Sequence, residues 1–119
     1  MQTTYLCAKH AEWVYTNPNE AAYFLSRDEK QGASLFNTGR YSDSIPYLGC
    51  AFDIAEILLE LDDNARPWLI KKLQTLSYML VCAYQMAEHA ELKQGIALRT
   101  INIVSTYLAA AHHEQSSLY

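Results

Sequence analysis

The chain has 119 residues, of which 50% are hydrophobic and 18% are charged. This composition is typical of a folded globular protein and excludes an intrinsically disordered chain. The length predicts one domain, residues 1–119. The formal net charge is −4 and the lysines and arginines do not cluster, so we expect no nucleic-acid partner.

The sequence gives no sign of a membrane or secretory protein. Its first residues, MQTTYLCAKHAEWVY, lack the basic start and continuous apolar stretch of a secretory signal. The longest apolar run, residues 78–84, is far shorter than the roughly 20 residues that cross a bilayer. The cysteines, Cys7, Cys50 and Cys82, are odd in number and widely spaced, which favours buried, reduced thiols. We therefore expect a cytoplasmic protein without membrane contact.

The pattern of helix breakers predicts an all-α fold of about five to six helices. Glycine and proline are scarce, and no bounded apolar and polar alternation indicates a strand. The first helix is expected over residues 3–16, and the second begins at Pro18. Ser26 and Glu29 match a capping box, which predicts a new helix from Ser26 to Thr38, ended by Gly39. One bent helix over residues 18–38 is the alternative.

The next helix is expected to run to Leu61, and its pattern is that of an interior helix. Asp43 or Ser44 is the expected N-cap, because Pro46 must lie in the first turn. Two neighbouring apolar stripes follow, with steps of three and four residues. They consist of Ile45, Leu48, Phe52, Ala55 and Leu59, and of Tyr47, Ala51, Ile54, Leu58 and Leu61. Such a helix needs neighbours on two sides, which leaves Asp53, Glu56 and Glu60 as a solvated strip.

Two further helices follow the acidic break at residues 62–64. A leucine stripe at positions 69, 73, 76 and 80 predicts a helix over residues 65–89. The last helix, residues 90–111, has two apolar stripes and is too apolar to face water on one side. A homodimer would cover that surface in the simplest closed form. Residues 112–119 are expected to form a frayed tail.

The segment from residue 26 to about residue 60 resembles the tetratricopeptide repeat (TPR), a unit of two antiparallel helices. The matching positions are Gly32, Leu35, Gly39, Tyr41, Ser44, Leu48 and Ala51. Asp28 stands where the motif has tryptophan, and Glu56 stands where it has the closing proline. From Leu76 to Tyr107 the order of helix, turn and helix recurs without the same spacing of small residues.

The resemblance implies a short stack of helical hairpins. Residues 3–24 would form an N-terminal hairpin or cap, residues 26–62 a TPR-like repeat, and residues 65–111 a degenerate second hairpin. In TPR proteins the first helix of each repeat lines a concave groove that binds peptides. By resemblance, the expected partner-binding residues are Phe36, Asn37, Tyr78 and Gln85.

No motif for catalysis, cofactor binding or metal binding was identified. The histidines at positions 10, 89, 112 and 113 lack the spacing of H-E-x-x-H and are expected on solvated helix surfaces. The carboxylates between residues 53 and 63 are likewise expected on a solvated face. P-loop, G-x-S-x-G and G-x-G-x-x-G sequences are absent, so we expect neither an enzyme nor a cofactor.

The sequence thus favours a TPR-like interaction module that binds a peptide or protein segment, as an adaptor or chaperone would. A self-associating structural or regulatory protein, whose apolar surface is covered in a homodimer, is the alternative. A helical bundle that binds a small molecule is a third hypothesis.

Overall fold

A computed structural model describes residues 4–117 of the chain, without the side chains of residues 90 and 110–117. Five helices account for almost all of this part: α1 (Ala8–Thr16), α2 (Pro18–Asn37), α3 (Tyr41–Leu61), α4 (Arg66–Met86) and α5 (Ala90–Ser117). The all-α fold and the expected number of helices are confirmed.

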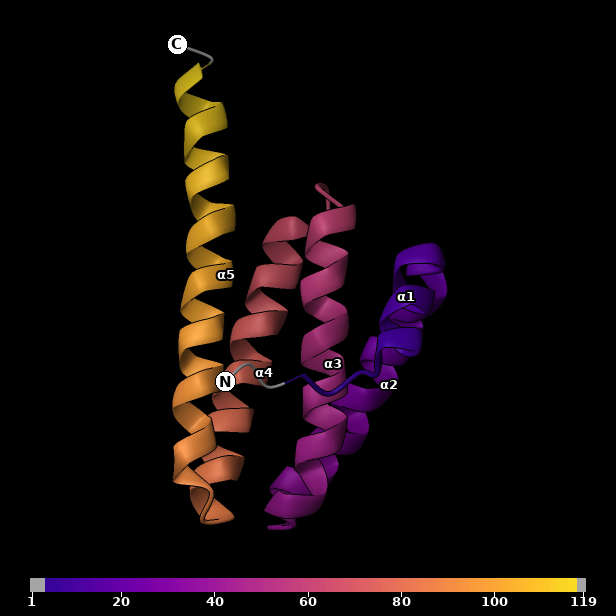
Figure 1. The fold of residues 1–119 in the computed structure, drawn as a ribbon, viewed down its shortest axis with the longest axis vertical. Coiled ribbons are helices and arrows are strands. Elements are labelled where there is room, and N and C mark those ends of the chain that lie inside the picture. Colours follow the sequence, from indigo (N-terminus) through magenta and orange to yellow (C-terminus); the bar gives the residue numbers. More distant parts are fainter. Residues whose placement is uncertain (1–3, 118–119) are drawn as a thin grey trace.

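The long helices lie side by side in chain order (Figure 1). Short turns join α2 to α3, α3 to α4 and α4 to α5, and each helix runs opposite to the one before it. The short α1 packs on α3 and α2 at one edge of the stack. At the other edge, α5 contacts α4, and its C-terminal end extends beyond the other helices (Figure 1).

Helix α3 is the centre of the core, as its two apolar stripes predict. It packs on α2 along one side and on α4 along the other, and Phe52, Leu48 and Leu59 are fully buried in it. Gly32 of α2 permits a close approach, because a Cβ atom there would lie 2.7 Å from the side chain of Leu48. One core extends through all five helices, from Val14 in α1 to Ile96 in α5.

The N-terminal part of the chain differs from the prediction in two places. The described residues before Ala8 are not helical, because the amides of Tyr5 and Leu6 donate to the side chain of Asp53 instead of entering a helix. The break at Ser26 was also wrong: α2 is continuous from Pro18 to Asn37, as in the alternative. The turn after α2 contains Gly39, whose φ of 81° lies in the left-handed region, as expected.

The start of α3 also corrects the prediction. The helix begins at Tyr41, so Asp43 and Ser44 lie inside the first turn and Pro46 lies beyond it. Asp43 pairs with Arg40 at 2.7 Å, and the Ser44 hydroxyl donates to the carbonyl of Tyr41 at 2.6 Å. These two contacts reinforce the helix start ahead of the proline.

The later turns follow the predicted breaks closely. Asp62 accepts hydrogen bonds from the amides of Asn64 and Ala65 and so shapes the turn before α4. Helix α4 ends at Met86, earlier than expected, because Glu88 adopts a φ of 64° that ends the helix. Helix α5 continues past residue 111 to Ser117 rather than fraying. The rest of the expected tail, residues 118–119, lies outside the described residues.

The cysteines are less buried than expected. Cys7 is exposed, and Cys50 and Cys82 are half-buried. Within residues 4–117, no helix combines the length and the apolar character that a membrane crossing requires.

Candidate functional site

A largely apolar pocket of about 550 Å³ lies between α1, α2 and α3. Its apolar lining consists of Leu6, Trp13, Val14, Phe24, Pro46, Tyr47 and Ile54. Its polar lining consists of His10, Arg27, Asp28 and Cys50. The residues come from the extended N-terminal segment and from three helices, so the pocket exists only when these elements are assembled.

Aromatic rings shape the pocket. Trp13 of α1 packs edge-to-face on Phe24 of α2, with 5.5 Å between the ring centroids. The guanidinium group of Arg27 lies over the Phe24 ring at 4.4 Å from its centroid. Tyr47 of α3 remains partly exposed and lines the pocket too, although its stripe position predicts packing in the core. Large rings with exposed surface are typical of sites that bind other molecules.

Asp28 supplies a carboxyl group to this apolar lining. Its side chain is only 14% exposed, and the nearest nitrogen of Arg27 is 3.7 Å away. Burial raises the pKa of this carboxyl above its ordinary value, although Arg27 acts to lower it. The carboxyl is therefore partly removed from water without full compensation by a protein cation.

The Cys50 thiol is not activated in this environment. Burial, together with the negative charges of Asp28 and Asp53, raises the pKa of Cys50 to about 11. The thiol therefore stays protonated at neutral pH, and a protonated thiol is a poor nucleophile. Cys50 contributes a small, weakly polar surface to the pocket.

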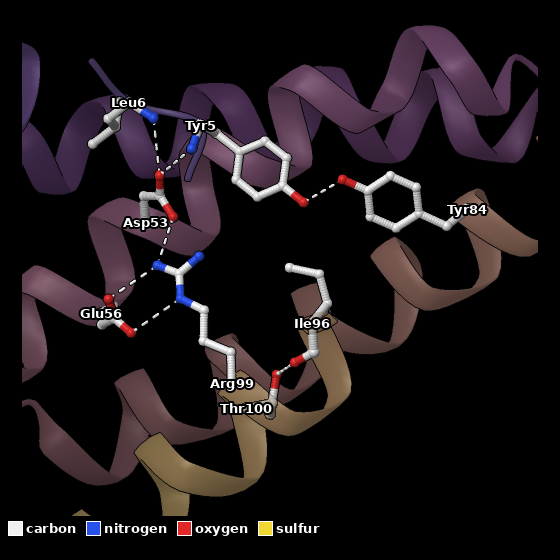
Figure 2. Close-up of polar contacts among 8 residues, drawn as sticks. All are labelled: Tyr5, Leu6, Asp53, Glu56, Tyr84, Ile96, Arg99 and Thr100. Carbon is white, nitrogen blue, oxygen red and sulfur yellow. Dashed lines mark hydrogen bonds and ion pairs between the residues drawn. The ribbon is translucent and has the colours of Figure 1, made fainter. Parts of the chain in front are cut away.

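A buried polar cluster, which we call the Asp53 cluster, holds the N-terminal segment in place (Figure 2). One carboxylate oxygen of Asp53 accepts hydrogen bonds from the backbone amides of Tyr5 at 2.6 Å and Leu6 at 2.9 Å. The other oxygen accepts a hydrogen bond from Arg99 of α5 at 2.7 Å. Arg99 also binds Glu56 at 2.9 Å, so the cluster links α3, α5 and the N-terminal segment.

The Asp53 cluster continues through the Tyr5 side chain. The Tyr5 and Tyr84 hydroxyl groups hydrogen-bond to each other (Figure 2). The Tyr5 ring also packs on Gly49 of α3, where an added Cβ atom would lie 2.1 Å from the ring. Burial and the bond to Tyr84 raise the pKa of Tyr5, so its hydroxyl stays protonated. With Tyr5 fixed, the adjacent Leu6 is positioned as part of the pocket wall.

The residues expected to bind a partner lie elsewhere. Phe36 is half-buried at the end of α2 and packs edge-to-face on Tyr41, and Asn37 next to it is exposed. Tyr78 is exposed on α4, and the Gln85 side chain accepts a hydrogen bond from Lys93. None of the four lines the pocket between α1, α2 and α3.

One important acidic residue differs from its sequence interpretation, and another was not singled out as a site residue. Asp53, expected on a solvated strip, is 5% exposed, because its partners come from positions 5 and 99. No local pattern signals those distant contacts. Asp28 counted only against the TPR resemblance, because it stands where that motif has tryptophan, and the sequence did not predict that it lines the pocket.

The histidines fall in different places. His10 lines the pocket and is exposed, and His89 is exposed in the turn before α5. The side chains of His112 and His113 lie outside the described residues. The described residues contain no group of three or more metal-ligating side chains.

Comparison with known proteins gave no match: no family model, curated protein or solved structure is detectably similar to this chain.

Proposed function

We propose that the protein is a TPR-like interaction module that binds a segment of a partner protein, with an apolar side chain of that segment in the pocket. The observation that carries this proposal is the pocket of about 550 Å³, mostly apolar and lined by Trp13, Phe24 and Tyr47. A groove between helices that accepts apolar anchors is a common mode of peptide recognition.

The chemistry of the pocket favours a protein segment over a polar metabolite. Its polar groups are few, and the apolar surface comes mainly from large side chains. Aromatic residues of this kind are enriched where proteins contact each other. The close approach of Gly32 to Leu48 supports the TPR-like relationship between α2 and α3, because the repeat also uses a small residue there.

Selection from a displayed library of random peptides tests this proposal. The matched variants are Tyr47→Ala, which removes a pocket residue, and Tyr78→Ala, which removes an exposed tyrosine of the groove expected by resemblance. We expect enriched peptides that lose about tenfold in affinity with Tyr47→Ala, equivalent to about 1.4 kcal/mol, and keep it with Tyr78→Ala. The opposite pattern would move the site to α4, and the absence of enriched peptides would overturn the proposal.

Self-association through α5 is a second candidate function, favoured by one specific observation. Leu98, Ile101 and Leu108 are 61%, 60% and 55% exposed. Their spacing of three and seven residues places them on one face of α5. A second copy of the chain could cover this face by pairing α5 with α5 about a two-fold axis.

Sedimentation analysis of Ile101→Lys distinguishes this second candidate. Asn102→Lys is the control, because it adds the same charge at the neighbouring exposed position. We expect a wild-type dimer that Ile101→Lys converts to a folded monomer, whereas the control remains dimeric. A monomeric wild-type protein would exclude this function.

A further inference from the structure

Asp28 occupies an unusual position, because it places a carboxyl group within a mostly apolar pocket. The side chain is 14% exposed, and neighbouring pocket residues include Phe24, Tyr47 and Ile54. An ionised carboxylate can only accept hydrogen bonds, and it loses stabilisation when water is removed without a replacement donor. A molecule that fills the pocket would remove the remaining water from Asp28.

The neighbouring cation compensates Asp28 incompletely. The Arg27 guanidinium approaches Asp28 at 3.7 Å, longer than a direct hydrogen bond, and it lies over the Phe24 ring. The Arg27 side chain is 60% exposed, so most of it is in contact with water rather than buried against Asp28. An incoming donor can therefore reach the Asp28 carboxylate without breaking a buried ion pair.

We infer that Asp28 recognises a cationic group, so that the bound partner segment presents a lysine or arginine beside the apolar side chain that fills the pocket. The inference rests on the proposed function and names the chemistry of its partner. An ammonium or guanidinium group would form a charge-assisted hydrogen bond to Asp28, which is stronger than a bond between neutral groups. The apolar side chain would contact Trp13 and Tyr47.

Charge distinguishes this partner from an anionic one. Arg27 and Lys30 border a second hollow beside the pocket, together with Asp28, Gln31 and Tyr47. An anion bound in the pocket could pair with Arg27 at the opening, but its charge would be opposed by Asp28. A cation in the apolar pocket instead gains the interaction with Asp28, while the exposed Arg27 stays solvated at the opening.

Three small probes with the same ring test the inference by NMR titration of the full chain: phenethylamine, 2-phenylethanol and 3-phenylpropanoate. They carry a cationic, a neutral and an anionic end group. We expect phenethylamine to bind about tenfold more tightly than 2-phenylethanol, with shifts at pocket residues. Asp28→Asn should remove this difference, because a preference for a cation over a neutral hydroxyl requires the charge of the carboxylate.

Asp43→Asn is the matched control, because it removes the same charge from an exposed site outside the pocket. It should preserve the advantage of phenethylamine. Equal loss in both variants would mean that only net charge matters and would overturn the role of Asp28. Equal binding of the probes, or tightest binding of 3-phenylpropanoate, would overturn it as well and leave the pocket intact as a binding site. The absence of shifts with all three probes would overturn the inference and the proposed pocket together.

Peptide selection supplies a second, independent measurement. Peptides enriched on the wild-type protein should carry a lysine or arginine near their apolar anchor, and those enriched on Asp28→Asn should lack this preference. The same basic preference in both selections would contradict the inference while supporting peptide binding.

Discussion

Two aspartates on the central part of the fold have opposite surroundings. Asp53 is buried, but it accepts hydrogen bonds from two backbone amides and from Arg99. Asp28 is nearly as enclosed, yet the closest cation is 3.7 Å away. A buried charge is tolerated when several donors replace water, as they do at Asp53. A carboxylate without such donors is better suited to an external ligand than to holding the fold together.

The largest effect should come from Asp53→Ala. The substitution leaves Arg99 with only part of its partners and removes the acceptor of two amides. We expect the free energy of unfolding to fall by about 3 kcal/mol, measured by urea denaturation. Asp43→Ala is the control, since its ion pair with Arg40 is exposed, and it should cost under about 1 kcal/mol. Equal losses would show that the Asp53 cluster is not a structural anchor.

A smaller effect is expected from Gly49→Ala. The added Cβ atom would lie 2.1 Å from the Tyr5 ring, so the N-terminal segment must shift. Overpacking costs about 1–3 kcal/mol, and alanine regains about 1 kcal/mol through helix propensity. We expect a net loss of about 1 kcal/mol in urea denaturation and faster hydrogen exchange of the Tyr5 and Leu6 amides.

The double variant Tyr5→Ala/Gly49→Ala tests the cause. Removing the ring makes room for the new methyl group, so the two losses should be less than additive. Additive losses would place the strain elsewhere than at Tyr5.

The smallest effect on stability should come from Asp28→Asn. The folded-state pKa of Asp28 is raised, so the folded protein binds more protons than the unfolded chain between the two pKa values. The unfolding free energy of the wild type therefore falls, relative to the variant, as pH rises through this window. At pH 7 we expect the unfolding free energy of the variant to exceed that of the wild type by under about 1 kcal/mol. The difference should vanish at low pH, where the wild-type carboxyl is also neutral.

Denaturation of both proteins across the acid range checks this prediction. A variant that is clearly less stable than wild type at neutral pH would show that the Asp28 carboxylate stabilises the fold.

The fold was largely predictable because periodicity is a local property. The two apolar stripes of the segment that forms α3 indicated an interior helix, and Leu48 and Phe52 are indeed fully buried. The boundaries were less predictable where a distant contact competes with helix formation. The Tyr5 amide, for example, donates to a side chain 48 positions away.

The candidate site could be predicted only in part. The sequence did not identify Asp28 as a site residue, because its role depends on a pocket that also requires Leu6 and Trp13 from outside the repeat. Asp53 and Glu60 lie two helical turns apart on the same face of α3, so periodicity predicts the same exposure for both, although only Glu60 is exposed. They differ because Asp53 accepts hydrogen bonds from Arg99 of another helix and from the amides of Tyr5 and Leu6.

The hydrogen bond between Tyr5 and Tyr84 spans 79 positions of the chain, whereas the hairpins of α2 with α3 and α3 with α4 join neighbouring segments. Closing a long loop costs more entropy than closing a short one, so we expect contacts between distant positions to form later than local ones. The N-terminal segment therefore completes its contacts only when Tyr84 of α4 and Arg99 of α5 are also in place. We therefore expect the pocket wall that Leu6 forms to assemble late in folding.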